Sequence, residues 1–597
     1  MESAQPHSGD IRKRMDVVEA GKEEGEEKDN SIVDYNRFPG TEDVKEAYMN
    51  WSGLILSRSD QYGKEDKALV RVPIIVHVWG IKNVLSREKA LAEVAKQENN
   101  FVPSNKRTGW LERIRKLPFL RCIVERQLKL VGRNIEKDLK KDFVNSPFKT
   151  VLPQQGHDVV TIVNEVRDYL NLSKINWKTG SVSGAIYSPN DLSCEQLMLQ
   201  VYQMTMKSNH LHADVFSGVR KMEAELIRWV INLFNGDAEC CGSISSGGTE
   251  SILLACKAYR DFAMKTRGIV RPEIVIPVTA HAAFDKAADW LQLEIRKVPI
   301  DPKTMKVDTR KMRKMMSRNV VMIVGSAPNY PHGIVDPIEE IAQIGERWNV
   351  PVHVDCCLGG FIMPFMDSAG FPVQPFDFRL KGVTSISADT HKYAMAPKGT
   401  SVIMYSNKKY LHCQFSVAQD WPGGIYITPT ISGSRPGAAV ACCWATLRYY
   451  GYDGYVRTCA QVITEARKVR DGIREFKELQ LLGDPEAMVV AFTSDKLNIF
   501  ELNSRLGVKH WHLNPLQFPS GIHFCFTAIH TQNNVAERFL KDLRETVSDM
   551  LKEPSSEVSP QAAVYGLAQT IPDRSLVKEI LFNYMDVVYS TEDYKGS

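Results

Sequence analysis

Short runs of β-branched residues alternate with helix-length amphipathic segments between residues 216 and 450, and this alternation limits the possible folds more than any other feature. Strands are predicted at residues 274–278, 320–325, 352–355, 383–387 and 401–405, and a helix over 337–348. Strands that are separated by helices are typical of a parallel sheet with helices on both faces. We therefore predict an α/β protein with a large, doubly wound, mostly parallel sheet.

Changes in this pattern divide the chain into five predicted segments. They are a tail over residues 1–48, an N-terminal helical segment over 49–215, the large α/β domain over 216–450, a smaller α+β domain over 451–552, and a C-terminal extension over 553–597. The tail mixes acidic and basic residues and lacks the apolar core of a signal peptide. We expect it to be a solvated segment.

Composition excludes several classes of protein. Of the 597 residues, 24% are charged and 43% are hydrophobic, as in ordinary globular proteins. A net charge of +4 is too small over this length to predict nucleic acid as a partner. The twelve cysteines include no Cys-x-x-Cys pair, which argues against a zinc ribbon or a disulfide framework and favours a reducing compartment.

One stretch, residues 106–141, is strongly basic, with twelve Lys or Arg against four acids and apolar residues between them. Such a stretch can lie on an anionic membrane surface, or it can form two amphipathic helices that pack on the main domain and turn their lysines to water. The longest early apolar run, residues 72–81, is well short of the roughly 18 to 20 residues that span a bilayer. We predict no transmembrane helix.

The first of three chemical motifs is the small-residue run SSGGTES at residues 245–251, directly before an apolar helix. Small residues let backbone N–H groups approach an anion, Thr249 adds a hydroxyl donor, and a helix N-terminus favours negative charge. The run is therefore a candidate phosphate site. By itself, such a run is more often a glycine-rich helix start without a ligand.

The second motif combines Lys392 with Asp355. Lys392 lies in a polar turn after the predicted strand 383–387, and Asp355 ends the strand 352–355, at the edge where open α/β sheets bind ligands. A lysine there can form a Schiff base with an aldehyde cofactor, although a lone loop lysine is usually only a surface residue. The carboxylate needs a cationic partner, and the protonated nitrogen of a pyridine ring would provide one.

The third motif is His281, which follows a predicted strand and opens a helix. Its imidazole can stack on a flat cofactor ring, or it can simply cap the helix. A phosphate loop, a ring-facing histidine, a strand-end aspartate and a lysine, in this order on one α/β domain, are together far more specific than any one of them. They predict an enzyme that uses pyridoxal phosphate.

Beyond these motifs, the sequence resembles the sphingosine-phosphate lyases, within the pyridoxal-dependent decarboxylase-like group of the aspartate aminotransferase fold. The resemblance extends from about residue 181 to about residue 573 and is carried by SGAIYS, SSGGTESILLACKAYRD, HVDCCLGGF, SISADTHKYAMAPKG and GSRPG. It implies fold type I, in which the domain over 216–450 binds the cofactor and the domain over 451–552 is the small domain.

The resemblance also implies roles for individual residues. Lys392 would carry the cofactor as a Schiff base, Asp355 would contact the ring nitrogen, and His281 would lie on the ring face. The implied contacts to the cofactor phosphate are Gly248, Thr249 and His391, together with Gly433 and Ser434 from a neighbouring subunit. A homodimer is therefore the expected unit. The implied contacts to the substrate phosphate are Tyr187, His212 and Lys398. Tyr330 is a further active-site candidate. His210 and His212 are not predicted to bind zinc, because no further ligands follow at suitable spacing.

The implied reaction is the retro-aldol cleavage of a phosphorylated sphingoid base to a long-chain aldehyde and phosphoethanolamine, a step in sphingolipid breakdown. The base that acts at the 3-hydroxyl is left open among Lys392, a tyrosine and the substrate phosphate. An amino-acid α-decarboxylase with the same cofactor residues is one alternative. A non-catalytic membrane-surface or scaffold protein that retains the fold is another.

Localisation is the property for which the sequence departs from the family. Members are usually anchored in the endoplasmic reticulum membrane by an N-terminal transmembrane helix, with the catalytic domain facing the cytosol. Because no such helix is predicted here, membrane attachment with a cytosolic catalytic domain is expected from the resemblance alone, and a cytosolic protein is the alternative. The basic stretch 106–141 is the candidate for contact with a membrane surface.

Overall fold

The structure is a computed structural model that describes residues 129, 131–552 and 574–592. The predictions for the tail 1–48 and for the run 72–81 lie outside the described residues. The same holds for most of the basic stretch 106–141 and for part of the C-terminal extension.

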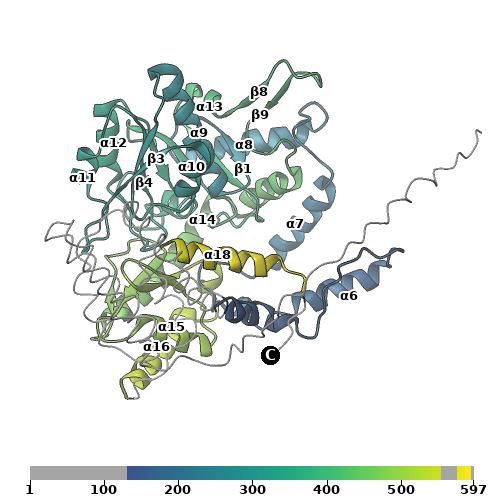
Figure 1. The fold of residues 1–597 in the computed structure, drawn as a ribbon, viewed down its shortest axis with the longest axis vertical. Coiled ribbons are helices and arrows are strands. Elements are labelled where there is room, and N and C mark those ends of the chain that lie inside the picture. The colour runs from purple at the N-terminus through teal and green to yellow at the C-terminus, as the bar shows by residue number, and fades with distance from the viewer. Residues whose placement is uncertain (1–128, 130, 553–573, 593–597) are drawn as a thin grey trace, which may run out of the picture. The chain divides into compact units, whose positions relative to one another are not determined.

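A sheet forms the centre of the large domain (Figure 1). Its seven strands lie in the order β1-β7-β6-β5-β4-β2-β3. The strands are β1 (Cys241–Ser245), β2 (Glu273–Pro277), β3 (Glu294–Val298), β4 (Val320–Ser326), β5 (Val352–Asp355), β6 (Val383–Ala388) and β7 (Ser401–Tyr405). Strands β3, β2, β4, β5 and β6 are parallel to one another, and β7 is antiparallel to both β6 and β1. The predicted mostly parallel sheet is confirmed.

The five predicted strands match the observed ones to within one residue at either end, and the predicted helix 337–348 is α12 (Ile338–Trp348). Two strands were not predicted. β1 reads CGSIS, whose small polar residues give no apolar run, and β3 reads EIRKV and lies partly exposed at the sheet edge. A strand at the edge of a sheet buries fewer of its side chains, so its sequence shows a weaker pattern of apolar residues.

Helices cover both faces of the large sheet, as a doubly wound fold requires. They are α8 (Ser217–Leu233), α9 (Gly248–Arg267), α10 (Ala283–Leu291), α11 (Thr309–Lys314), α12 and α13 (Lys408–Gln414). Successive strand residues point to opposite faces, so that Ile274 and Ile276 of β2 pack in the core beneath α9, whereas Val275 packs in the core beneath α8 and α12. Each such buried side chain contributes about 1.5–3 kcal/mol.

The small domain follows the long helix α14 (Gly437–Arg474), which bends at Gly451. There φ is 60° and ψ is 178°, a conformation that favours glycine. Beyond it lie a four-stranded antiparallel sheet in the order β10-β11-β13-β12 and two helices: β10 (Gln480–Leu481), β11 (Val489–Thr493), β12 (Asn514–Leu516), β13 (Gly521–Cys525), α15 (Ile499–Val508) and α16 (Val535–Lys552). The bend lies where the domain boundary is predicted, and the five-segment division stays a prediction.

The remaining elements lie before, between and after the two sheets. They are η3 (Lys141–Phe143), α6 (Val159–Leu170), η4 (Trp177–Thr179), α7 (Leu192–Thr205), η5 (Met363–Phe365), the hairpin of β8 (Ser416–Ala418) and β9 (Tyr426–Thr428), η6 (Ala528–Thr531) and α18 (Arg574–Tyr589). Within the described part of the chain, no helix combines the length and the hydropathy needed to cross a bilayer.

The described end of the basic stretch forms a helix over residues 131–140. Its last lysine, Lys140, is only 2% exposed and does not point to water. The Lys140 ammonium donates to the Glu136 carboxylate at 3.1 Å, to the Ser590 hydroxyl at 3.2 Å and to the backbone carbonyl of Glu592 at 2.6 Å. This lysine therefore joins the N-terminal helical segment to the C-terminal extension.

Candidate active site

The candidate site lies at the edge of the large sheet where the parallel strands end. β5 ends at Asp355, β6 ends at Ala388 and leads into the turn that carries Lys392, and β1 ends just before α9 begins at Gly248. Because β1 and β6 are each antiparallel to β7, they run in the same direction and end at the same edge. This is the edge at which open α/β sheets bind ligands.

The loop between β1 and α9 is held open by one buried carboxylate. Glu250 accepts hydrogen bonds from the Ser246 backbone N–H at 2.7 Å and the Ser246 hydroxyl at 2.6 Å, and its other oxygen accepts from the Ile431 N–H at 3.0 Å. Gly248 could not be any other residue without displacement, because a Cβ there would lie 2.8 Å from Cys357 Sγ and 2.9 Å from Asp389 Oδ2. The Asp389 carboxylate and the Cys357 thiol therefore lie directly against the start of α9.

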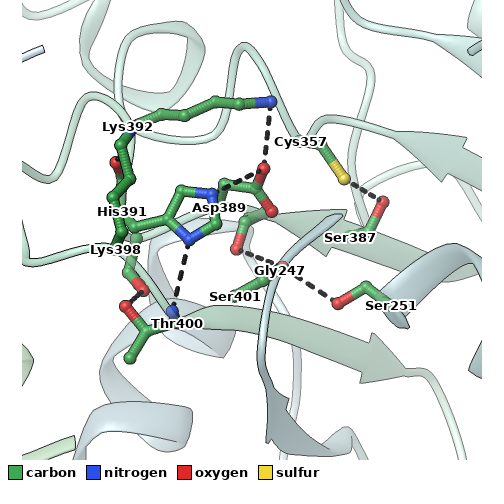
Figure 2. A network of polar contacts seen from close by, with 12 residues as sticks. Gly247, Ser251, Cys357, Ser387, Asp389, His391, Lys392, Lys398, Thr400 and Ser401 are labelled. Atoms are coloured by element: carbon green, nitrogen blue, oxygen red, sulfur yellow. Dashed lines mark hydrogen bonds and ion pairs between the residues drawn. The ribbon is translucent and has the colours of Figure 1, made fainter. Parts of the chain in front are cut away.

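Lys392 forms an ion pair with Asp389, its Nζ lying 2.9 Å from Oδ2 (Figure 2). Burial by itself would lower the pKa of Lys392 and raise that of Asp389. Their mutual attraction outweighs burial in both cases, so the pKa of Lys392 is raised, and that of Asp389 is lowered to about 2. The lysine is therefore held here as an ammonium ion.

Asp355 and His281 occupy the positions that the sequence predicted. The Asp355 carboxylate is 7% exposed and accepts the backbone N–H of Cys357 at 3.1 Å, which fixes its direction at the strand end. His281 Nδ1 accepts the N–H of Ala283 at 3.1 Å, so the imidazole does cap the start of α10. Its ring also meets the edge of Tyr330, with centroids 6.4 Å apart, and stays exposed.

Tyr330 follows β4 and reaches towards the small domain. Its ring packs edge-on against His523 of β13, with centroids 4.8 Å apart, and its hydroxyl accepts a hydrogen bond from Asn514 of β12 at 3.2 Å. The side chain is 43% exposed. Tyr330 therefore bridges the two domains beside His281.

Two of the three residues predicted to bind the substrate phosphate lie together. The Lys398 ammonium lies 4.6 Å from the centroid of the Tyr187 ring, a cation–π contact. Burial raises the pKa of Tyr187, whereas burial, followed by the charge of Lys392, lowers the pKa of Lys398. His212 is exposed in the turn after α7, and among the described residues no hydrogen bond or ion pair joins it to Tyr187 or Lys398.

Gly433 and Ser434 lie in a loop that is fixed to its own chain. The Ser434 hydroxyl accepts from the Asn209 amide at 3.1 Å, the Arg435 N–H donates to the Asn209 side-chain oxygen at 3.1 Å, and the Arg435 guanidinium pairs with Glu223. Between this loop and the β1–α9 loop lies a cavity, lined among others by His210, Ser246, Gly399, Ser432 and Arg435. The two loops of one chain thus border the same cavity.

Two site residues were missed from the sequence. Asp389 pairs with Lys392, and Glu250 joins the phosphate loop to residue 431. The strand-end position that singled out Asp355 would also have found Asp389, which directly follows β6. Glu250 gives no such signal, because it looks like any acidic residue in the first turn of a helix.

The residues present fit pyridoxal phosphate. The glycine-rich start of α9 offers backbone N–H groups, and His391 Nε2 lies 3.5 Å from the Asp389 carboxylate beside it. Asp355 ends β5, and Lys392 lies in the turn after the neighbouring strand β6. Asp389 Oδ1 is buried with no hydrogen-bond partner among the described residues, as expected for a polar atom that faces a ligand.

Comparison with known proteins agrees with this geometry. The pyridoxal-dependent decarboxylase conserved domain matches residues 145–495. The sphingosine-1-phosphate lyase of Drosophila melanogaster is 44% identical over 84% of this chain and 91% of its own length, and that of Saccharomyces cerevisiae is 42% identical over 79% and 81%. The structure of a Burkholderia pseudomallei sphingosine-1-phosphate lyase aligns with a TM-score of 0.69 and 34% identity, covering 75% of this chain and 99% of the other. A Lactobacillus brevis glutamate decarboxylase, 22% identical with a TM-score of 0.60 over 71% of this chain and 100% of its own, shares the fold.

Proposed function

The chain belongs to the sphingosine-1-phosphate lyases, and from this premise we propose how its own residues carry out the reaction. It is a pyridoxal-phosphate-dependent carbon–carbon lyase that cleaves phosphorylated sphingoid bases to a long-chain aldehyde and phosphoethanolamine, in sphingolipid breakdown. The family resemblance and the fold type I architecture predicted from the sequence are thereby confirmed.

Residues at the sheet edge would hold the cofactor. Gly248, Thr249 and His391 would bind its phosphate, Lys392 its aldehyde carbon, Asp355 its ring nitrogen and His281 its ring face. When bound, pyridoxal phosphate supplies an aldehyde for the substrate amine and a ring that takes up the electron pair left when the C2–C3 bond breaks. The Asp355 carboxylate supports this chemistry, because a negative charge at the ring nitrogen keeps that nitrogen protonated.

The substrate phosphate would be bound by Tyr187, Lys398 and His212. An ammonium, a phenol and an imidazole are suitable donors for a phosphate dianion. The contact between Lys398 and Tyr187 supports a shared site for the first two, next to the lysine that binds the cofactor. Binding energy at this remote group is used to orient the C2–C3 bond perpendicular to the cofactor ring.

Two groups of this chain are suited to move the proton of the substrate 3-hydroxyl. One is the amine of Lys392, and the other is the phenol of Tyr330, which lies beside His281. The substrate phosphate is the third candidate. Tyr330→Phe separates them, because it keeps the ring contact with His523 and removes only the hydroxyl.

We further propose a homodimer in which Gly433 and Ser434 complete the cofactor phosphate site of the partner copy. Apolar side chains are exposed along α6, on α7, on the β8–β9 hairpin and just after it: Val159, Val160, Leu170, Leu192, Leu199, Val417, Trp421, Ile425 and Ile431. Such faces mark protein interfaces more often than free surfaces. Light scattering of the purified protein should give twice the chain mass, and a monomer would contradict this proposal.

Attachment to the endoplasmic reticulum membrane, with the catalytic domain in the cytosol, is proposed from the family. The substrate supports it, because a phosphorylated sphingoid base carries one long chain and resides in membranes. Fractionation of the full-length protein tests the mode of attachment. Release by high salt indicates contact through the basic stretch 106–141, whereas release only by detergent indicates an anchor.

The observation that carries the lyase assignment is that Tyr187 and Lys398 lie directly beside the turn of Lys392. Purified protein loaded with pyridoxal phosphate should release a long-chain aldehyde from a phosphorylated sphingoid base and no CO2 from aromatic or acidic amino acids. Lys398→Gln should raise the KM about tenfold to a hundredfold, because it removes a charge-assisted hydrogen bond to phosphate. Lys381→Gln, at an exposed lysine before β6, is the matched control. Release of CO2 without aldehyde would identify an α-decarboxylase instead.

A further inference from the structure

The acid that pairs with Lys392 has no role in the assignments above. Asp389 directly follows β6 and is 2% exposed. Its Oδ2 lies 2.9 Å from Lys392 Nζ and 3.5 Å from His391 Nε2, so that one oxygen serves two cationic or donor groups (Figure 2). Its Oδ1 is buried and has no hydrogen-bond partner among the residues that the structure describes.

The contacts of His391 determine which of its nitrogens carries the proton. Nδ1 accepts the backbone N–H groups of Gly399 at 3.3 Å and Thr400 at 3.2 Å. A nitrogen that accepts cannot also carry a proton, so the proton of the neutral imidazole is on Nε2, on the side of Asp389. His391 is therefore a donor towards the phosphate site, and the Asp389 carboxylate stabilises it in that orientation.

The carboxylate also lies against the start of α9. A Cβ on Gly248 would be 2.9 Å from Asp389 Oδ2, so the carboxylate can occupy this place only because residue 248 is glycine. It thus lies beside the position proposed for the cofactor phosphate. Two adjacent anions repel one another strongly in a buried site. When the phosphate binds, the Asp389 carboxylate must therefore become protonated or move away.

Other ionisable groups around this pair are few. Among the described residues, six groups interact electrostatically with Asp389, Lys392 or both: Tyr187, Cys356, Cys357, His391, Lys398 and Cys525. Asp355 interacts with Cys356 and Cys357. Burial raises the pKa of each of the three thiols, which stay neutral. Asp389 is the counter-ion closest to Lys392.

We propose that Asp389 is a positioning residue that holds Lys392 as an ammonium ion and directs the His391 Nε2–H to the phosphate site, so that cofactor loading requires this ion pair to open by proton transfer. The Lys392 ammonium gives one proton to the Asp389 carboxylate, which becomes a neutral carboxyl group. The amine nitrogen then bonds to the aldehyde carbon of the cofactor, and the aldehyde oxygen leaves as water with the two hydrogens of that nitrogen. A neutral Asp389 can lie next to the phosphate.

This proposal rests on the cofactor of the family but on none of the substrate roles. Its test therefore uses pyridoxal phosphate alone and stays interpretable whatever the substrate assay gives. The cofactor-free enzyme is mixed with pyridoxal phosphate, and the absorbance band of the lysine-bound cofactor is followed from about pH 6 to about pH 9. The wild-type loading rate should rise with pH, because the ammonium ion cannot attack an aldehyde.

Asp389→Asn should load the cofactor faster than the wild type at neutral pH, by about tenfold or more. Loss of the counter-ion lowers the pKa of Lys392, and each pKa unit raises the fraction of reactive neutral amine about tenfold. Asp389→Glu keeps the charge and should keep the wild-type pH dependence. Asp377→Asn is the matched control, since Asp377 is equally buried but pairs with Arg379. An Asp389→Asn enzyme that loads with the wild-type pH dependence, or more slowly at neutral pH, overturns the proposal.

A measurement on the wild type keeps the proposal testable if Asp389→Asn does not fold. Cofactor-free enzyme is labelled with formaldehyde and cyanoborohydride, and peptide mass spectrometry follows Lys392 and Lys398 separately as a function of pH. The pH midpoint of labelling should be higher for Lys392 than for Lys398, because only Lys392 has the Asp389 carboxylate at 2.9 Å. Equal midpoints, or a lower one for Lys392, would overturn the proposal.

Discussion

The proposed cofactor site and the proposed substrate-phosphate site differ in the elements that position their residues. Asp355 ends β5 and accepts a backbone N–H, and His391 and Lys392 lie in the turn just after β6, where Lys392 pairs with Asp389. Of the residues proposed for the substrate phosphate, Tyr187 and Lys398 meet, but His212 is exposed in a separate turn. The first set thus lies at or just beyond the sheet, whereas Tyr187 and His212 come from the loops before α7 and α8.

This difference indicates what each site needs from its surroundings. A strand end is held by the sheet hydrogen bonds and by the core on both faces, so residues at or just after it are positioned before any ligand binds. Loops with exposed apolar neighbours, such as the β8–β9 hairpin with Trp421 and Ile425, gain their order from further contacts. The proposed second copy would supply these contacts.

The largest expected effect comes from removing the lysine of the cofactor site. Lys392→Ala should abolish the visible absorbance band and lower kcat by at least about 10⁴-fold, because it removes the amine proposed to bind the cofactor aldehyde. Spectroscopy and aldehyde assays of the variant check this. A retained band would mean that the sheet edge is not the cofactor site and that the comparison above fails.

Acid should weaken the fold through its buried histidines, which lie in both domains. Burial lowers the pKa of His332, His353, His523 and His530 to about 4 in each case. In the unfolded chain these histidines bind protons near pH 6.5, whereas in the folded chain they stay neutral down to about pH 4. The free energy of unfolding therefore falls as the pH falls from about 6.5 to about 4, by up to about 3 kcal/mol for each histidine. Burial raises the pKa of Asp336 to about 6, which offsets part of this loss.

Urea unfolding at neutral and acidic pH measures this effect. The midpoint concentration should drop steeply below about pH 6.5. His353→Gln should flatten the drop, whereas a change at the exposed His281 should leave it unaltered. A midpoint that is independent of pH in this range would contradict the lowered pKa values of the buried histidines.

A smaller effect is expected from filling the space beside Asp389. Gly248→Ala places a Cβ 2.8 Å from Cys357 Sγ and 2.9 Å from Asp389 Oδ2. We expect cofactor affinity to fall about tenfold to a hundredfold, in keeping with overpacking costs of about 1–3 kcal/mol. Gly218→Ala in α8 meets no atom within 4 Å and is the control. Equal cofactor affinity in both variants would contradict a preformed phosphate site.

The smallest expected effect concerns the substrate side. Tyr187→Phe keeps the ring that Lys398 contacts and removes one donor to the phosphate, so the KM should rise about threefold to tenfold with the cofactor band unchanged. Burial and the charge of Lys392 lower the pKa of Lys398. The wild-type KM should therefore rise at a pH below the one at which an ordinary lysine loses its proton. Steady-state kinetics across the alkaline range checks both expectations, and a KM that is constant in both tests would contradict a phosphate site at Tyr187 and Lys398.

Much of the cofactor site could be predicted because its signals are local. A strand-end acid, a glycine run before a helix and a lysine after a strand are each visible within a few residues, and the structure places Asp355, Gly248 and Lys392 at one sheet edge. The edge strands β1 and β3 were missed because partial exposure removes the apolar pattern. The roles of His212 and Ser434 stay predictions that rest on the resemblance.

The sequence by itself determined the α/β class, the positions of five strands along the chain and the residue types proposed for the cofactor site, because these depend on short-range periodicity and on motifs. Only the tertiary structure decided that β7 lies antiparallel between β1 and β6, that Glu250 reaches residue 431, and that Asp389 pairs with Lys392. Each of these is a contact or a pairing direction that depends on how the chain packs. Their energies come from burial and charge in three dimensions, which no window of the sequence contains.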